Sequence, residues 1–217
     1  MAERLALHAQ TRADDPIGDL IQNIDDKRST HVPGQGLRRH GAKPATGHAI
    51  DLSAPTDSPI TGDPSLPHVV IVDKTMHKTH LFEQDPATGK PKEIFSTPDA
   101  TGKGDGWTPV GRYTVVERHL HPTYTPTHGG ATVAAGPDNP LGPAKVRLAD
   151  SSGHWTNIEM HGTNNDNSIG NNASHGCVRH HNRAIAQMYP FLRIGTPVYI
   201  TNKYDPAQLI RSTDFSK

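Results

Sequence analysis

The chain has 217 residues, a length that suits one substantial domain with additional sequence. Its 22 Lys and Arg residues balance 22 Asp and Glu residues, so the net charge gives no reason to expect nucleic acid or an anionic membrane surface as a partner. The longest purely aliphatic run, Val69 to Val72, is far too short for a membrane span, and none is expected.

Residues 1–67 are predicted to form a polar, flexible N-terminal arm. They contain no aromatic residue and are rich in Pro, Gly, Asp, Ser and Thr, so they can bury little apolar surface. The first residues, MAERLALHAQTRADD, lack the apolar core of a secretory signal. Two roles stay open for the arm: a docking or solubilising segment, or a recognition segment that contacts secretion machinery or another partner.

Residues 68–203 are predicted to form a mostly β domain, followed by a C-terminal tail at 204–217. Short β-branched runs separated by Gly, Pro and Asn clusters are typical of antiparallel strands. The runs are HVVIVD, KTHLFEQ, KEIFS, GRYTVVERH, AKVRLAD, TNIEMHG and TPVYITN. The Pro- and Gly-rich segment from His119 to Gly142 predicts a long loop over a cleft.

One helix is expected near the end of this domain. In NRAIAQMYPFL the apolar residues repeat at helical intervals, Asn182 is a suitable N-cap and Pro190 marks the last turn. The helix would follow directly after the segment ASHGCVRHH, which holds the one cysteine of the chain, Cys177.

Cys177 has the neighbours that a nucleophilic thiol needs. His161 and His175 are candidate bases, Arg179 can stabilise a thiolate, and Gly176 leaves the backbone N–H groups open to a substrate carbonyl. A free cysteine is more often a small buried residue. Here the preceding NNDNSIGNN indicates a surface loop, which favours the functional interpretation.

The stretch MHGTNNDNSIGNNASHGCVR resembles the signature of the L,D-transpeptidase catalytic domain, also called the YkuD-type domain. STPDATGKGDGWTPVGRYTV, NPLGPAKVRL and GTPVYI are similar to three further blocks of that family, in the same order. His180 departs from the pattern, because an apolar residue is usual there. The resemblance implies a β-sandwich or barrel with one or two short helices, one of them after the cysteine.

The resemblance also implies the catalytic residues. Cys177 would be the nucleophile, and His161 its general base and acid, with the ring oriented by the Gly162 carbonyl. Gly176 and Cys177 would supply the N–H groups of an oxyanion hole, and His175 would shape the site. We expect a partly formed thiolate–imidazolium pair between Cys177 and His161 at rest.

Three residues are expected to contact substrate. Arg179 suits a carboxylate, because its guanidinium can form paired hydrogen bonds. Ser174 is expected beside the nucleophile as a structural or substrate-binding hydroxyl, and Tyr113 is placed in the donor groove, with core packing as its alternative.

The implied reaction is acyl transfer on peptidoglycan stem peptides, without metal or other cofactor. The thiolate would attack the carbonyl of the third-position diamino acid and release the terminal D-alanine. The acyl group would then pass to an amine, a D-amino acid or water. The resemblance places the protein in the periplasm or cell envelope.

Two alternatives stay open at this stage. The same domain could serve as a secreted toxin that acts as an L,D-carboxypeptidase or exchange enzyme. A different class, a metal-binding protein, is suggested by the 15 histidines, including those at 77–80, 119–121 and 180–181. None of these has the spacing of a zinc motif.

Overall fold

The computed structural model describes residues 59–127 and 129–205. A nine-stranded sheet dominates this part of the chain, with a short helix after β8 and a turn of 3-10 helix before β7. The elements are β1 (His68–Asp73), β2 (Lys78–Gln84), β3 (Pro91–Gly102), β4 (Gly111–Leu120), β5 (Ala144–Asp150), β6 (Trp155–His161), η2 (Asp166–Ser168), β7 (Asn172–Ser174), β8 (Val178–His180), α2 (Asn182–Met188) and β9 (Pro197–Thr201). The mostly β fold with short helices is confirmed.

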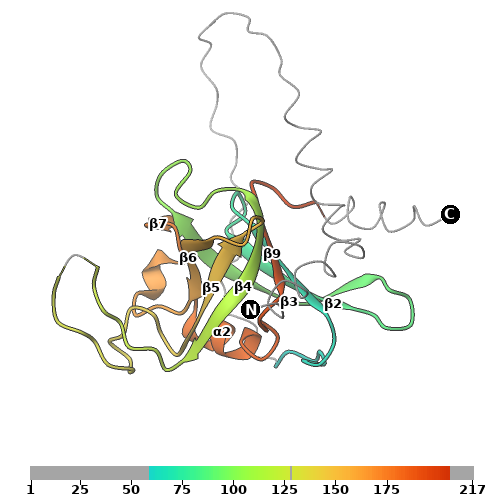
Figure 1. The fold of residues 1–217 in the computed structure, drawn as a ribbon, viewed down its shortest axis with the longest axis horizontal. Helices are drawn as coiled ribbons and strands as arrows, with labels where there is room; N and C mark the ends of the chain where they lie inside the picture. Colours follow the sequence, from blue (N-terminus) through green and yellow to red (C-terminus); the bar gives the residue numbers. More distant parts are fainter. Residues whose placement is uncertain (1–58, 128, 206–217) are drawn as a thin grey trace, which may run out of the picture.

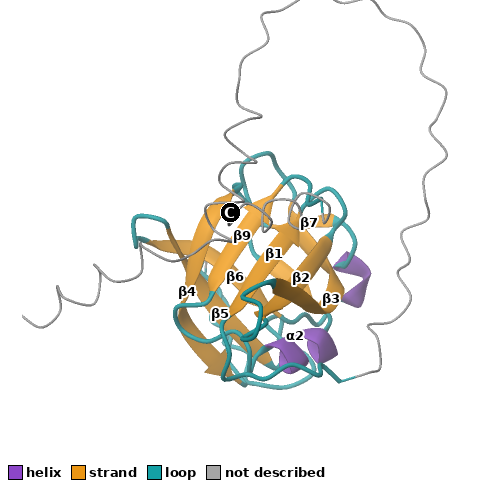
Figure 2. Cartoon of the chain, turned by 90° about the vertical axis from the view of Figure 1, so that its right-hand side faces the viewer, coloured by secondary structure: helices purple, strands orange, loops and turns teal. Residues whose placement is uncertain are grey.

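The sheet closes into a barrel (Figures 1 and 2). The strand order is β2-β1-β9-β4-β5-β6-β8-β3-β7, and an additional pairing between β2 and β3 joins the two sides. The expected antiparallel arrangement holds for most pairs. It is wrong for three, because β1 pairs with β9, β6 with β8 and β3 with β7 in parallel. Such pairings connect strands far apart in the chain, and local sequence patterns do not reveal them.

The hydrophobic core fills the barrel. Alternate strand residues such as Val146, Leu148, Ile158 and Met160 lie in this cluster. β1 is buried on both faces, because Val70 and Val72 join the core while Val69 and Ile71 join a second cluster with Phe82 and Tyr199. This double burial explains the unbroken apolar run of its sequence.

Helix α2 packs one face into the core at one end of the barrel. Ala184, Ile185 and Met188 are fully buried, and the helix ends at Met188, before Pro190. The cap position is held by His181, not by the expected Asn182, and no side chain caps the helix. Asn182 is the first helical residue, and its side chain binds elsewhere, as described below.

The predicted arm at 1–67 and tail at 204–217 lie largely outside the described residues. Within the described part, Ile60 packs against the barrel core, and Arg193 donates a hydrogen bond to the Ser65 carbonyl. The residues just before β1 therefore contact the domain. Among residues 59–127 and 129–205, no helix has the length and apolar character to cross a membrane.

The segment between β4 and β5 is a long loop, as predicted, although β4 extends to Leu120. Asn139 is buried at its centre. Its side-chain amide donates to the carbonyls of Pro122, Val133 and Ala134, and its oxygen accepts the N–H of Leu141. One buried side chain thus fixes the course of this loop.

Candidate active site

The site is built on the outer face of β6 and β8. Ile158 and Met160 point into the core, so the alternate residues Glu159 and His161 lie on the opposite face of β6. β8 runs parallel to β6, with His161 beside Arg179 and Met160 beside Val178. Val178 belongs to the core, and its two neighbours, Cys177 and Arg179, are therefore on the same outer face as His161.

His161 is buried and its ring is held in one orientation. Its Nδ1 lies 2.6 Å from the Gly162 carbonyl oxygen, so Nδ1–H donates and Nε2 keeps its lone pair. Burial lowers the pKa of His161 to about 4, although the hydrogen bond to Gly162 acts in the opposite direction. The ring is thus a neutral imidazole with an available base nitrogen.

The turn after His161 is fixed by helix α2. The Asn182 side-chain oxygen accepts the N–H of Thr163 at 2.8 Å, while the Gly162 N–H donates to the Leu141 carbonyl at 2.9 Å. A Cβ added to Gly162 would meet Asn182 Oδ1 at 2.3 Å, so only glycine fits in the present arrangement. The Gly162 carbonyl that orients His161 is therefore clamped between the β4–β5 loop and the helix.

The segment before Cys177 is equally constrained. Gly176 has φ 132°, and a Cβ there would meet the Trp107 carbonyl oxygen at 2.5 Å. The buried Ser174 hydroxyl accepts the Gly176 N–H at 3.0 Å and donates to the Cys177 carbonyl at 2.6 Å. Thr108 donates its hydroxyl hydrogen to the Gly176 carbonyl at 2.9 Å. These bonds hold the nucleophile loop from both sides.

The Cys177 thiol lies 3.7 Å from the Asn157 carbonyl oxygen, its hydrogen-bond partner in the described part of the chain. Burial raises the pKa of this thiol, and the charge of Glu159 adds to the rise. Burial thus lowers the pKa of His161 and raises the pKa of Cys177, and each shift favours the neutral form of its group. These shifts oppose the expected thiolate–imidazolium pair, which stays a prediction for the resting site, because burial disfavours both charges.

A network of charged groups continues from the site across the sheet. Glu159 Oε1 accepts hydrogen bonds from Lys145 Nζ at 2.9 Å and from Arg147 Nη2 at 2.8 Å. Arg147 Nε also pairs with Glu117 at 3.1 Å, and Glu117 contacts His119 at 2.6 Å. Sequence reasoning missed Glu159. The signal was its position two residues before His161 in a predicted strand, because residues two apart in a strand lie on the same face.

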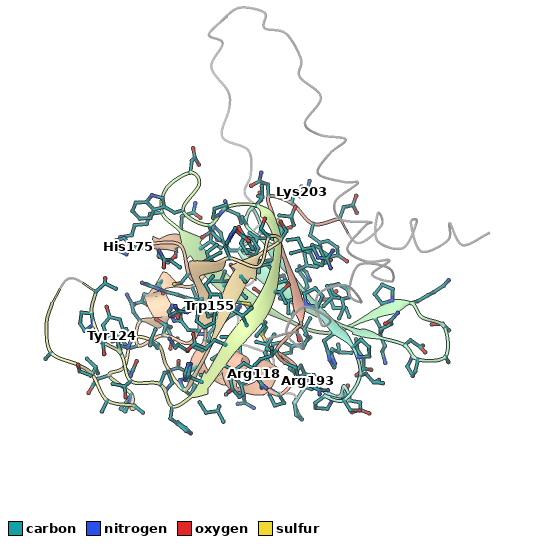
Figure 3. The ribbon with its side chains drawn as sticks, in the orientation of Figure 1. Arg118, Tyr124, Trp155, His175, Arg193 and Lys203 are labelled. Atoms are coloured by element: carbon teal, nitrogen blue, oxygen red, sulfur yellow. The ribbon has the colours of Figure 1, made fainter. Side chains whose placement is uncertain are left out.

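The remaining predicted residues are not all at the surface of the site. Ser174 is 1% exposed and bonded within the loop, so it positions Cys177 instead of meeting substrate. Tyr113 belongs to the core, and its hydroxyl donates to the Pro109 carbonyl at 2.9 Å. The His175 ring is exposed and stacks on Trp107 at a centroid distance of 5.2 Å (Figure 3). Arg179 stays beside His161, half-buried.

The histidines noted as metal-ligand candidates have other partners. His80 pairs with Glu93, His181 with Asp166, and His180 Nε2 lies 2.9 Å from the Thr79 hydroxyl. In the described residues, no group of three or more His, Cys, Asp or Glu side chains is arranged to hold a metal ion.

Comparisons with known proteins show the family of this chain. The family model of the L,D-transpeptidase catalytic domain, YkuD, matches residues 67–200. The chain belongs to this family, and it is an enzyme of the L,D-transpeptidase type. The match includes both His161 and Cys177.

Individual relatives carry the same family name. Bacillus subtilis YqjB, named as an L,D-transpeptidase, is 31% identical over 67% of this chain and 76% of its own length. Escherichia coli YcfS, also so named, is 36% identical over 46% of this chain but only 34% of its own length. The solved structure of Bdellovibrio bacteriovorus Bd1075 is similar with a TM-score of 0.51 and 20% identity, over 72% of this chain and 56% of that one. This last likeness concerns the fold alone.

Proposed function

We propose that the protein catalyses acyl transfer on peptidoglycan stem peptides through a thioester on Cys177. The observation that most directly supports this proposal is the 2.6 Å hydrogen bond from His161 Nδ1–H to the Gly162 carbonyl. It leaves Nε2 as an unprotonated base on the face of the sheet that carries Cys177. A backbone carbonyl here takes the orienting role that a carboxylate has in other triads.

The first half-reaction forms the thioester. As the substrate carbonyl arrives, the Cys177 proton moves to His161 Nε2 and the thiolate attacks the carbonyl carbon. The C–N bond then breaks, and the imidazolium gives its proton to the leaving amine of D-alanine. Because burial shifts the pKa of both groups toward their neutral forms, we expect proton transfer and attack to be coupled to substrate binding.

The second half-reaction regenerates the thiol. An acceptor amine, or water, loses a proton to His161 and attacks the thioester carbonyl. Cys177 leaves as a thiolate and recovers the proton from the imidazolium. Cross-linking, D-amino-acid exchange and carboxypeptidase activity differ only in this acceptor.

The oxyanion that forms in each half-reaction needs a donor. Since Gly176 N–H already donates to Ser174, the Cys177 N–H is the donor that we assign to this task, and the local positive charge of Arg179 assists it. A substrate in the peptidoglycan layer places the enzyme in the cell envelope.

Incubation with purified muropeptides, followed by mass spectrometry of the products, tests this function. We expect loss of terminal D-alanine from tetrapeptide stems with wild-type protein, and none with Cys177→Ala or His161→Ala. A carbapenem, which is itself an acyl donor, should add once per chain to wild type. Turnover or a stable adduct on the Cys177→Ala protein would contradict the assignment.

A further inference from the structure

A polar cavity lies next to the catalytic loop, separate from the thiol. It has a volume of about 270 Å³ and opens where the β1–β2 turn, the end of β3, β7 and the end of β9 meet. The residues that line it include Lys74, His77, Lys103, Asn172 and Asn202. None of the catalytic steps described above uses these residues.

The cavity has an excess of positive charge. In the part of the chain that the structure describes, neither Lys74 nor Lys103 forms an ion pair, and the one acidic side chain at the rim, Asp105, is not paired with either. Lys74 is half-buried, which strengthens its interaction with a charged ligand compared with a solvated lysine. Two unpaired ammonium groups at one concave site favour an anion.

Neutral hydrogen-bond donors complete the wall. The Asn172 side-chain oxygen accepts from the Thr101 hydroxyl at 3.0 Å, which leaves its NH₂ group for another partner. His77 has φ 48°, a left-handed conformation that is uncommon for a residue other than glycine, and its Nδ1 has no hydrogen-bond partner among the described residues. Such features often mark a binding site.

The cavity is tied directly to the nucleophile loop. The Lys103 N–H donates to the Ser174 carbonyl at 3.0 Å, and the Ser174 hydroxyl in turn holds Gly176 and Cys177. Peptides span about 3.3–3.6 Å per residue when extended, so a few residues of a bound peptide can bridge the thiol and the cavity. The cavity residue Asn172 lies only five positions before Cys177 in the chain.

We propose that this cavity binds a free carboxylate of a stem peptide while another part of the peptide reacts at Cys177. The proposal rests on the function proposed above and identifies how its substrate is held. A carboxylate suits the site because it accepts charge-assisted hydrogen bonds from both ammonium groups and from the asparagine amides. Donor and acceptor stems both carry such carboxylates, and the experiment separates them.

The first measurement is calorimetric binding of a synthetic tetrapeptide stem to the full-length Cys177→Ala protein. Each free carboxylate of the peptide is replaced in turn by a carboxamide. We expect one amidation to weaken binding on the order of tenfold, the effect of one charged hydrogen bond. Lys74→Met should weaken binding of the acid peptide by a similar factor and reduce the difference between that acid and its amide, because Lys103 alone then supplies the charge.

Two further variants test whether the change in peptide binding depends on charge and whether it depends on the cavity. Asp105→Asn removes the negative charge at the rim and should tighten binding of the acid peptide without affecting the amide. Lys92→Met, at the other end of β3, should change neither. Equal loss of acid and amide binding in Lys74→Met, no detectable binding of either, or the same loss in Lys92→Met would overturn the proposal.

Kinetics in the otherwise wild-type enzyme assign the carboxylate to its source. A slower thioester formation in Lys74→Met places it on the donor stem, and slower aminolysis of the preformed thioester places it on the acceptor. If the peptide binds as expected but wild type never forms a thioester, the proposed function fails and the carboxylate site stands. If the thioester forms but acid and amide bind alike, the carboxylate site fails alone.

Discussion

Glu159 is the residue that sets the charge balance beside the nucleophile. It is 9% exposed, and Lys145 and Arg147 both donate to its Oε1. Its negative charge raises the pKa of the Cys177 thiol, which adds to the larger effect of burial there. The same charge raises the pKa of His161, where it opposes the larger lowering by burial. A carboxylate at this place opposes premature ionisation of the thiol, which is consistent with a nucleophile that is activated only when substrate is bound.

Glu159→Gln should therefore lower the pKa of Cys177. The variant removes a negative charge and leaves two cations nearby, and both changes favour the thiolate. We expect the midpoint of iodoacetamide alkylation against pH to fall by roughly half a unit to one unit from a wild-type value above the ordinary 8.5 or so. Glu93→Gln, which removes an ion-paired carboxylate from β3, is the control. An unchanged or higher midpoint in Glu159→Gln would contradict this role.

Asp99 is a second unusual carboxyl, buried in the wall of the barrel on β3, where it lies opposite His180 of β8. The Thr79 hydroxyl donates to its Oδ2 at 2.7 Å, and the same hydroxyl oxygen lies 2.9 Å from His180 Nε2. Burial raises the pKa of Asp99 to about 8. Through the Thr79 hydroxyl, a polar chain links Asp99 to His180 within the barrel wall.

Asp99 should make the protein less stable as the pH rises. Its folded-state pKa lies above the unfolded value near 3.9, so the native state loses stability between about pH 4 and pH 8. Buried His161 and His180, with lowered pKa values, act only below about pH 6.5, where stability falls as the pH falls.

The window from pH 6.5 to 8 therefore isolates Asp99. Over it, wild type should lose about 2 kcal/mol of unfolding free energy more than Asp99→Asn, which stays neutral and keeps an oxygen for Thr79. Urea denaturation at the two pH values measures this difference. Equal losses in the two proteins would show that Asp99 does not titrate in this range.

At the scale of elements, helix α2 controls the catalytic base through one side chain. Asn182, at its first turn, binds the N–H of Thr163 and lies against Gly162, whose carbonyl orients His161. Only one residue separates β8 from the helix, which no side chain caps. Its contribution is to fix the backbone of the turn that follows β6.

Asn182→Ala should damage catalysis more than stability. The change leaves a partly buried N–H without its partner, which costs about 1–3 kcal/mol, and frees the turn at 162–163. We expect kcat to fall at least tenfold with little change in KM, since the base loses its orientation but the substrate surface is kept. Asn171→Ala, in the loop between η2 and β7, serves as the control. A selective rise in KM would instead place Asn182 in substrate binding.

The residues just before β1 behave as part of the barrel. Ile60 packs on the core, and Ser65 accepts a hydrogen bond from Arg193. Deletion of residues 1–58 should leave the unfolding free energy nearly unchanged, on the basis of their composition. Deletion of 1–66 should cost about 1–2 kcal/mol more, because Ile60 loses its buried contacts. Thermal and urea unfolding of the two truncated proteins distinguish these outcomes, and equal stability would show that the Ile60 contact is unimportant.

The strands could be predicted from the sequence, and His161 and Cys177 could be proposed as reactive residues, because the signals for both are local. HVVIVD and TNIEMHG have strand patterns, and the glycines at 162 and 176 mark the turns beside His161 and Cys177. The parallel pairings, the role of Asn182 and the place of Tyr113 depend on contacts between distant segments. The directions in which burial shifts the pKa of His161 and of Cys177 depend on such contacts too, since both groups are buried only when β5, β6 and β8 assemble.

For the whole molecule, the parallel pairing of β1 with β9 separates the two ends of the domain. β1 begins near Arg193 and α2, where Ser65 is bound, whereas β9 ends at Thr201 beside the β1–β2 turn. Figure 3 places Arg193 at one end of the barrel and Lys203 at the other, the end at which His175 also lies. The catalytic loop and the lysine-lined cavity thus share the end from which the C-terminal residues leave.

Because the candidate site and the start of β1 lie at opposite ends of the barrel, the position of an attachment tag decides which end faces a solid support. Anchored through a tag placed before residue 59, the molecule would present its reactive end outward, toward an insoluble polymer such as an intact sacculus. The same tag placed after residue 205 would set that end against the support and crowd the approach of a large substrate. Soluble muropeptides, being small, would be processed equally well in either orientation, so the ratio of sacculus to muropeptide turnover on the two supports would report which end of the barrel faces the wall.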